Sequence, residues 1–467
     1  MLNILRNFQV LTEDEIEAIH RQSLKILAEI GCKVPHPEFL KLFQEAGANV
    51  KDEHVYIPGK LCAEALEYAR NRVTTFNPRK EKGKLRACMS SEAFFIDYKT
   101  KEKRAGTTKD ILKGLVIGNS LPNVDIVMPI VHPEDVANEI ADIVSHQLCF
   151  LYSEKPFHAW TLSPETADYI LRMAVVAEKP VTYIGEIISP LQISWETLEI
   201  ALKYAALDFP VGFGSIVNAG SSGPVTLAGT LALQNAEYLL GLILVYLLKV
   251  SRPVTFAAGA HTMDLRTMAC SFGSPNQALL AMAQTQLSKY YGLPATWNVG
   301  LSDANYPDFQ SGFEKGMSAA LAMAAGIDDI GLQGIVGADQ GGSLEQLVID
   351  NEWIDALNHV FRGMKIDEET LAFDVTHNVG IGGMFISESH TVEHMREVYW
   401  NSGLFNRDSW DSWIKKSGGD LLDAAAAKVE KILLEKYPPK MLVSQEVAGR
   451  LESIVNDASQ KLIKGDK

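Results

Sequence analysis

The chain alternates between two apolar patterns from about residue 106 onward. Continuous runs rich in Val, Ile and Phe are typical of strands buried on both faces, whereas apolar residues at every third or fourth position are typical of amphipathic helices. The predicted strands cover residues 124–130, 157–162, 180–188, 210–217, 253–260, 295–301 and 329–336. The helices predicted between them cover residues 133–147, 163–178, 194–208, 226–250, 276–292 and 308–326.

This alternation predicts a parallel sheet covered by helices, which is an α/β fold. No strand is followed by GxGxxG and a later acidic residue, as an open dinucleotide-binding sheet would usually show. We therefore predict a TIM-type (βα)8 barrel. Seven strands are clear, and we expect the eighth near Cys149–Tyr152 or after Gly380.

Two regions flank the predicted barrel. A Thr12–Glu15 capping box begins an N-terminal helix, and residues 84–107 are typical of two strands or a hairpin. We expect three parts: an N-terminal extension with helices and a hairpin over residues 1–105, the barrel over 106–419, and C-terminal helices over 420–467.

Composition and charge restrict the class of protein. The chain has 467 residues, of which 47% are hydrophobic, and its net charge of −15 disfavours nucleic acid and anionic membranes as partners. Its five cysteines never occur as CxxC, which is typical of a reducing compartment. The most apolar run, residues 239–250, is too short to span a bilayer, and the first residues lack a secretory apolar stretch. We expect a cytoplasmic protein.

The candidate site lies where the predicted strands end, because barrel enzymes place catalytic residues there. These ends carry rings, acids and amides, and no Lys or Arg: Trp160, Tyr183, Glu186, Asn218, His261, Trp297, Asp303, Tyr306, Phe309, Gln310 and Gln333. Rings and carboxylates suit a quaternary ammonium ion, which gains roughly 0.5–2 kcal/mol per ring contact. For a single ring such as Trp297 or Tyr183, ordinary core packing is the alternative.

Two further motifs allow other interpretations. His390–His394 match HxxEH, the inverted zinc-protease pattern, but a third acidic ligand is not evident, and the start of a helix is the alternative. Residues 375–391 are glycine-rich without a Lys after the glycines, so they favour backbone flexibility or close approach of a large partner over a phosphate loop. Three interpretations of His377 stay open at this point: a ligand, a hydrogen-bond donor or a buried histidine with a structural role. We expect no metal site.

Three segments carry a resemblance that covers most of the chain. Residues 300–326, 343–354 and 380–400, in this order, resemble the trimethylamine:corrinoid methyltransferase family. The resemblance implies a TIM-type barrel whose mouth docks a corrinoid protein. It also implies that a methyl group moves from an amine to Co(I) of the cobalamin on that partner.

Founding members of this family use pyrrolysine, and this chain has none. The resemblance puts Asn305 in the corresponding loop. The imine of pyrrolysine suits an amine with a lone pair, whereas a quaternary amine has no lone pair and is already an activated methyl donor. The resemblance therefore favours glycine betaine. Proline betaine, carnitine and a non-catalytic quaternary-amine binding protein remain the alternatives.

The expected roles follow from this chemistry. Glu186 and Asp303 supply the catalytic charge. The groups expected to bind the substrate are Trp160, Tyr183, Trp297, Tyr306, Phe309, Gln310, Gln333 and His377. The groups expected to meet the cobalamin are Asn218, His261, Gly380, Gly382 and Gly383. No acid–base residue is required, and a homo-oligomer is compatible with such a barrel.

Overall fold

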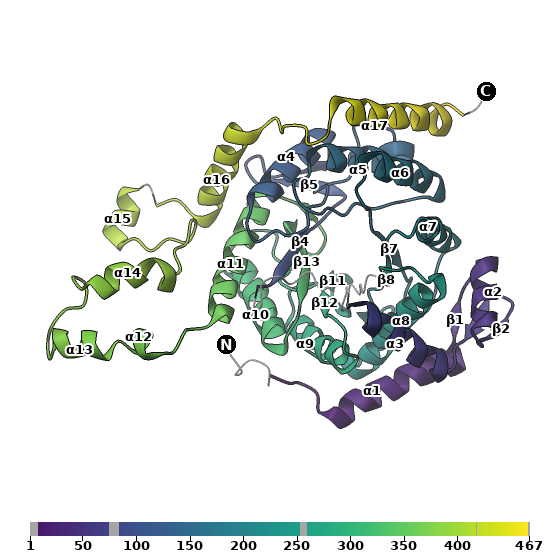
Figure 1. Cartoon of the computed structure of the whole chain (residues 1–467), viewed down its shortest axis with the longest axis horizontal. Coiled ribbons are helices and arrows are strands. Elements are labelled where there is room, and N and C mark those ends of the chain that lie inside the picture. Colours follow the sequence, from purple (N-terminus) through teal and green to yellow (C-terminus); the bar gives the residue numbers. More distant parts are fainter. Residues whose placement is uncertain (1–7, 74–83, 253–258, 417, 466–467) are drawn as a thin grey trace.

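The computed structural model describes residues 8–73, 84–252, 259–416 and 418–465. Figure 1 shows its helices arranged as a ring around short central strands, with one segment projecting from the side. The helices that follow the central strands are α4 (Thr108–Ser120), α5 (Ala141–Tyr152), α6 (Pro164–Ala177), α7 (Trp195–Ala206), α8 (Leu227–Leu248), α9 (Pro275–Tyr290), α10 (Phe309–Ala325) and α11 (Leu344–Arg362).

The central strands pair in parallel. They are β4 (Arg86–Met89), β7 (Tyr183–Glu186), β8 (Val211–Gly214), β12 (Thr296–Trp297) and β13 (Asp329–Gln333). β13 lies between β12 and β4, and β7 pairs with β8. Parallel bridges at Cys88–Ile126 and Val127–Phe157 continue the pairing from β4 to the next two segments. These pairings confirm the α/β class. Residues 253–258 of one predicted strand lie outside the described residues.

The eighth strand was predicted in the wrong place. Cys149–Tyr152 lies within α5, and the residues after Gly380 lie outside the ring. The additional strand is β4, whose run of four residues is followed closely by the antiparallel hairpin β5 (Phe94–Asp97) and β6 (Glu102–Ala105). The predicted hairpin is confirmed. In the sequence, β4 lies so close before the hairpin that the pattern did not separate the two. The main sheet therefore begins before residue 105.

An ion pair joins β4 to β13, the earliest and latest of these parallel strands in the chain. Arg86 Nη2 donates to Asp329 Oδ2 at 2.6 Å, and the guanidinium Nε donates to the other carboxylate oxygen. The two residues are 243 positions apart in the sequence. Because each strand carries one partner, this contact forms only when both strands are in place.

The flanking helices agree with the predicted ones. α1 (Glu13–Lys25) begins with the Thr12–Glu15 capping box, and two helices occupy the C-terminal residues. The remaining N-terminal elements are β1 (Cys32–Lys33), α2 (Pro37–Glu45), β2 (Asn49–Lys51), β3 (His54–Tyr56) and α3 (Gly59–Val73). The C-terminal helices are α16 (Leu421–Lys436) and α17 (Gln445–Ala458).

α8 is the most apolar helix of the ring. Among the described residues it alone is long and apolar enough to cross a membrane by length and composition, yet 89% of the relevant window is buried inside the protein. It packs against α1, α3 and β8. Burial on all sides by protein explains its apolar composition.

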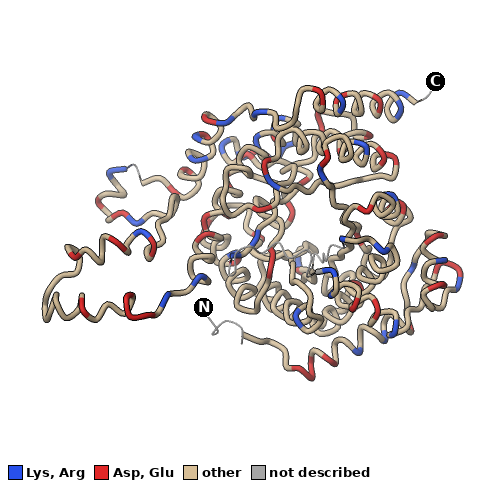
Figure 2. Tube along the Cα trace, in the orientation of Figure 1, with Lys and Arg blue, Asp and Glu red and all other residues tan. Residues whose placement is uncertain are grey.

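Residues 364–415 project from the ring after α11, and we call this segment the arm (Figure 1). It contains four short helices: α12 (Glu368–Leu371), α13 (Phe373–Val379), α14 (Ser389–Val398) and α15 (Trp410–Lys415). None of them has a buried residue. Figure 2 shows acidic and basic residues interspersed along the arm and around the outside of the ring. The sequence pattern assigns the arm to the barrel, but it lies outside the ring.

Candidate functional site

The register of β7 and β8 directs Glu186 toward the inside of the ring. A Cβ on Gly185 would meet the ring of Phe213 and Thr197 of α7 at 2.8 Å, so Gly185 faces the helices. Because side chains alternate along a strand, Glu186 faces the opposite way. Its partner across the ladder is Gly214. Glu186 therefore faces inward opposite a residue that has no side chain.

Unpartnered polar atoms lie at the ends of β4 and β13. Gln333 is fully buried, and its Nε2 donates to the Gly331 carbonyl at 2.8 Å while its Oε1 has no hydrogen-bond partner. Ser90 donates its backbone N–H to the Gln333 carbonyl at 2.9 Å, and its buried Oγ also lacks a partner. A buried polar group without a partner costs about 1–3 kcal/mol, so a ligand that pairs with it gains affinity.

His158 and Trp160 form a second inward-facing pair. Phe157 packs against Phe150 of α5, with ring centroids 5.1 Å apart, so it faces the helices. By alternation His158 and Trp160 share the other face, where their rings lie 5.1 Å apart. Neither ring nitrogen of His158 has a hydrogen-bond partner. Burial lowers the pKa of His158 to about 4, so the imidazole is neutral at pH 7.

His261 is a second buried, neutral imidazole, held by a small sheet of β9 (Asn218–Ala219), β10 (His261–Asp264) and β11 (Ala269–Ser271). It pairs with Asn218 across the parallel ladder, and its ring lies 4.7 Å from that of Phe272. Both of its ring nitrogens lack a partner, and burial lowers its pKa to about 4. Asn218 Oδ1 accepts a hydrogen bond from Cys270 Sγ at 3.0 Å.

Carboxylates surround the same end of the strands. Burial, followed by the charge of Asp339, raises the pKa of Glu92 to about 8. Burial and the same aspartate raise the pKa of Glu186. The pKa of the Cys270 thiol rises to about 12 through burial, with Asp303 and Asp339 adding to it. The charged groups acting on these three side chains are all acidic, so a cation entering the site would be stabilised.

Asp303 does not present a free carboxylate to this space. Its Oδ2 accepts from Ser271 Oγ at 2.5 Å, and its Oδ1 accepts from the amides of Phe272 (2.5 Å) and Gly273 (3.1 Å). Its own amide donates to Glu314 Oε2 at 2.9 Å. Asp303 therefore fixes the loop after β11 rather than meeting a substrate, because its oxygens already accept hydrogen bonds.

The rings predicted to surround the substrate do not gather in one place. Trp297 and Tyr183 are almost completely buried, and they pack toward the helices against Tyr238 of α8 (6.1 Å) and Tyr204 of α7 (5.3 Å). Trp297 and Tyr183 are therefore core residues. Of the predicted rings, only Trp160 lies on the same face as His158.

Three predicted residues lie at the start of α10. Tyr306 OH donates to Asp420 at 3.1 Å, Phe309 is 85% exposed, and Gln310 donates to Glu314 at 2.9 Å. None of these contacts joins them to Glu186 or to the other inward-facing groups. Their position beside a strand end made them candidates, and the side chain of Asp308 caps the helix that begins there.

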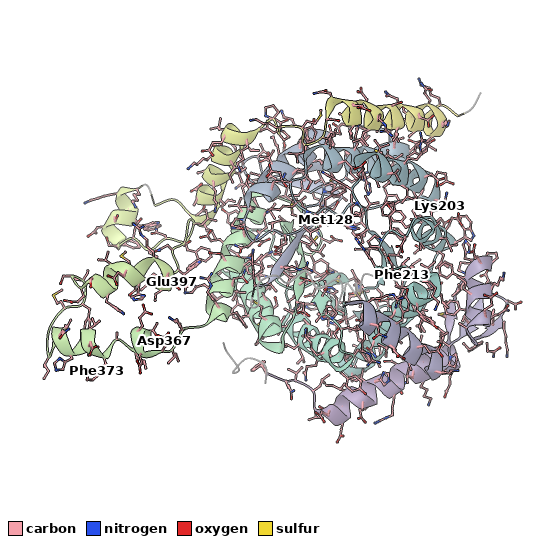
Figure 3. The ribbon with its side chains drawn as sticks, viewed as in Figure 1. Met128, Lys203, Phe213, Asp367, Phe373 and Glu397 are labelled. Atoms are coloured by element: carbon pink, nitrogen blue, oxygen red, sulfur yellow. The ribbon has the colours of Figure 1, made fainter. Side chains whose placement is uncertain are left out.

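The predicted residues of the glycine-rich segment lie on the arm. His377 is exposed in α13, and Gly380, Gly382 and Gly383 follow it. Figure 3 shows Phe373 of the same helix at the outer end of the arm, far from Met128 and Phe213 in the ring. These four residues therefore do not share a site with Asn218 and His261. The apolar, glycine-rich composition gave no sign that the segment leaves the ring.

The HxxEH histidines also lie on the arm. The rings of His390 and His394 are 4.4 Å apart, and His394 Nε2 lies 3.8 Å from a carboxylate oxygen of Glu369. Within the described residues, no group of three or more His, Cys, Asp or Glu side chains could hold a metal ion. The zinc interpretation gains no third ligand from the structure.

A buried ion pair supports the loop after β13. Asp350 of α11 is fully buried and accepts from Lys315 Nζ of α10 at 3.1 Å. It also accepts from the Gly334 amide (2.8 Å), Gln346 Nε2 (2.9 Å) and Trp353 Nε1 (2.8 Å). Because Gly334 follows Gln333, this cluster sets where the end of β13 lies.

Two hollows on the outside of the molecule contain none of the predicted site residues. One, of about 800 Å³, lies between α6, α7 and α17 and includes Arg172, Lys203 and Arg450. The other, of about 660 Å³, lies beside Cys32 and Pro190. Neither contains the inward-facing groups, so the candidate site is defined by Ser90, Glu92, His158, Trp160, Glu186, His261 and Gln333.

Comparison with known proteins identifies the family. A family model described as trimethylamine methyltransferase (MTTB) matches residues 1–456. The chain belongs to this family. It is similar to the glycine betaine methyltransferase of Desulfitobacterium hafniense (strain Y51), with 28% identity over 472 residues that cover 97% of this chain and 98% of that protein. It is also similar to the trimethylamine methyltransferase MttB of Methanosarcina barkeri, at 29% identity, with 97% and 95% covered.

Solved structures with a similar fold are methylamine methyltransferases. The crystal structure of a hydroxylamine MtmB complex has a TM-score of 0.52 with 9% sequence identity, covering 92% of this chain and 90% of that one. The monomethylamine methyltransferase MtmB of Methanosarcina barkeri has a TM-score of 0.51 at 9% identity, covering 91% and 88%. At this identity the likeness concerns the fold alone. The family resemblance predicted from residues 300–400 is confirmed.

Proposed function

We propose that this chain transfers a methyl group from a quaternary amine, with glycine betaine the leading donor, to the Co(I) cobalamin of a corrinoid protein. The reaction takes place at the carboxyl end of a (βα)8 barrel. The observation that carries the proposal is the cluster of acids Glu92, Glu186 and Asp339: the charge of Asp339 raises the pKa of the other two carboxyls, and among the described residues no basic group acts on either of them. The similarity to a glycine betaine methyltransferase supports the choice of donor.

The acids favour a permanent cation. At an effective dielectric constant of about 20, a unit charge about 5 Å from a carboxylate gains about 3 kcal/mol. A quaternary ammonium has no N–H to donate, so diffuse attraction to carboxylates and to the Trp160 ring is the interaction open to it. Glu186 is the proposed main contact, since Gly214 opposite leaves the space in front of it without a β8 side chain.

The other end of glycine betaine is a carboxylate, which needs donors. Ser90 Oγ–H and one N–H of the neutral His158 ring are buried and make no hydrogen bond of normal geometry, so both fit this role, although Glu92 and the Thr182 backbone lie close to them. His377 was predicted to bind the substrate but lies on the arm, so we assign the substrate carboxylate to Ser90 and His158 instead. Gln333 Oε1 can only accept, so we assign it to an N–H or O–H group rather than to the carboxylate.

The chemical step needs no proton transfer. The C–N bond of the donor breaks and its electron pair stays on nitrogen, which leaves dimethylglycine with a neutral tertiary amine and its carboxylate unchanged. The methyl carbon forms a bond with cobalt through the electron pair of Co(I), and cobalt becomes Co(III). Cobalamin belongs to the partner and is a substrate here. The chain's own task is to hold the N–CH3 bond in line and to exclude water. Because positive charge fades at nitrogen, a very tight ion pair would slow the reaction.

The test mixes the purified chain, free cob(I)alamin and glycine betaine, and measures loss of the Co(I) absorbance together with dimethylglycine by mass spectrometry. We expect both signals in equal amounts. Glu186→Gln should lower the rate at least tenfold, about 1.4 kcal/mol. The matched control, Glu196→Gln on the first turn of α7, should leave the rate unchanged. Activity with trimethylamine but with none of glycine betaine, proline betaine or carnitine would overturn the proposal.

The same assay tests the non-catalytic alternative. A quaternary-amine binding protein would bind glycine betaine without producing dimethylglycine. Since Co(I) survives only under reducing conditions, we place the reaction in the cytoplasm, in keeping with five free cysteines.

A further inference from the structure

The loop after β7 begins directly after Glu186. The ladder between β7 and β8 ends at Ile187, whose amide donates to the Gly214 carbonyl at 2.8 Å. Beyond that point Leu191 has a positive φ of 59°, a conformation that residues other than glycine rarely adopt. The loop also borders the hollow of about 660 Å³ beside Pro190, so packing does not hold it on that side. The course of this loop therefore depends on polar contacts.

A buried carboxylate on α8 supplies two of these contacts. Glu237 is fully buried; its Oε2 accepts from Ser189 Oγ at 2.6 Å, and its Oε1 accepts from the Leu191 amide at 2.9 Å. A third contact comes from the N-terminal part of the chain, where the Lys33 amide of β1 donates to the Leu191 carbonyl at 2.9 Å. The Leu191 backbone is thereby fixed through both its N–H and its C=O.

α8 packs against β8 (Figure 1), and the same face of the helix holds the end of that strand. Gln234, one turn before Glu237, donates from its Nε2 to Ser215 Oγ at 2.9 Å. The close approach of the helix depends on Gly241, one turn after Glu237, because a Cβ there would lie 3.1 Å from the Phe213 carbonyl oxygen. This face of α8 therefore holds the residues that follow both β7 and β8.

A carboxylate at this position is unfavourable for stability. Burial raises the pKa of Glu237, and the hydrogen bonds from the loop and from Ser215 offset this only in part. Among the described residues no basic group acts on this carboxyl, whereas the buried Asp350 is paired with Lys315. A buried charge without a counter-ion destabilises a fold. Its presence beside the end of β7 therefore favours a role in function.

We propose that Glu237 is a positioning residue for Glu186. It fixes the loop after β7 and thereby directs the Glu186 carboxylate at the space in front of Gly214. The inference rests on the proposed function, in which Glu186 is the main contact of the quaternary ammonium. A misplacement of about 1 Å at a reacting site can cost about a hundredfold in rate. A group that does not touch the donor can therefore still decide how well the donor is held.

The experiment compares two variants of Glu237 in the assay with glycine betaine and free cob(I)alamin. Glu237→Leu removes both acceptors, so KM for glycine betaine should rise at least about tenfold, while KM for cob(I)alamin stays within about twofold of its natural value. Glu237→Gln keeps an acceptor for the Leu191 amide, and its NH2 can donate to Ser189 Oγ, so it should restore most of the affinity. A smaller amount of folded protein alone would leave both KM values unchanged.

Asn235→Leu is the matched control on the same helix. Asn235 is also buried, and its Nδ2 donates to Ser23 Oγ at 2.9 Å and to Tyr291 OH at 2.8 Å. These two contacts join α8 to α1 and to the end of α9, not to the loop after β7. The control therefore loses a similar set of buried hydrogen bonds, and it should keep the natural KM for glycine betaine.

Carbodiimide labelling of Glu186, mapped by mass spectrometry, needs no substrate. The reagent reacts with the protonated carboxyl, so the pH of half-maximal labelling follows the pKa of Glu186, which burial and then the charge of Asp339 raise. In Glu237→Leu the released loop exposes Glu186 to more water, which lowers that pKa, so the midpoint should move to lower pH. Glu237→Gln and Asn235→Leu should keep the natural midpoint.

The outcomes separate this inference from the proposed function. An unchanged Glu186 midpoint or an unchanged KM for glycine betaine in Glu237→Leu would overturn the inference. An equal midpoint shift in Asn235→Leu, or a Glu237→Gln variant as impaired as Glu237→Leu, would also overturn it. If the natural chain is inactive with glycine betaine, the proposed function fails, whereas the labelling result still decides whether Glu237 positions Glu186.

Discussion

Removal of the Asp350 carboxylate tests how the end of β13 is held. In Asp350→Ala, the Lys315 ammonium, which is almost completely buried, loses its counter-ion, and the Gly334 amide and the Trp353 indole lose their acceptor. Breaking a buried ion pair from one side costs about 3–5 kcal/mol. The lost hydrogen bonds act in the same direction, so we expect at least about 4 kcal/mol. That is a large part of the 5–15 kcal/mol typical of a domain.

The assay is urea unfolding of the full chain followed by circular dichroism, with the free energy taken at an unchanged slope. The informative control is Lys315→Met/Asp350→Leu, which removes both charges and replaces them with apolar side chains of similar size. It should recover most of the loss, because the cost lies in the unpaired charge. A loss below about 1 kcal/mol in Asp350→Ala, or a double variant as unstable as the single one, would refute this reasoning.

Three further predictions use the same protein. Trp297→Ala should lower the free energy of unfolding by about 3–5 kcal/mol, because it removes a buried core side chain. Its affinity for glycine betaine, measured by calorimetry, should stay unchanged. A loss of affinity without a loss of stability would show that Trp297 contacts the substrate. His158 and His261 are held neutral, with pKa values of about 4, so stability should fall as pH drops from about 6.5 to 4, by on the order of 3 kcal/mol each. His158→Gln should remove its share of this acid sensitivity in urea titrations. Because a bound cation favours ionised Glu92, whose pKa is about 8, betaine affinity should rise about tenfold from pH 7 to 9, and Glu92→Gln should flatten that profile.

The helices and the family could be predicted from the sequence because both depend on long patterns. Capping boxes and three-to-four spacing recur over many residues, and the family motifs span residues 300–400. The direction of single side chains could not be predicted in the same way. The runs around Trp297 and Tyr183 are apolar on both faces, so the two-residue period that separates inward from outward is hidden there.

The residues that sequence reasoning missed have identifiable causes. Ser90 and Glu92 follow a strand of only four residues in a region assigned to the extension. His158 lies two positions before Trp160, and strand alternation from Trp160 could have found it. Asp303 was correctly placed at a loop, but nothing in the sequence shows that its oxygens are already occupied by the amides of residues 272 and 273.

The pairing of Arg86 with Asp329 has a consequence for biosynthesis. Arg86 and Asp329 leave the ribosome 243 residues apart. At about 5–20 residues per second, Asp329 therefore follows Arg86 after about 12–49 s. During that interval β4 has an open edge and its helices lack their full cover. Nascent chains of this protein should therefore depend on chaperone holding until translation has passed residue 333, and ribosome-bound truncations that end before β13 should stay sensitive to protease.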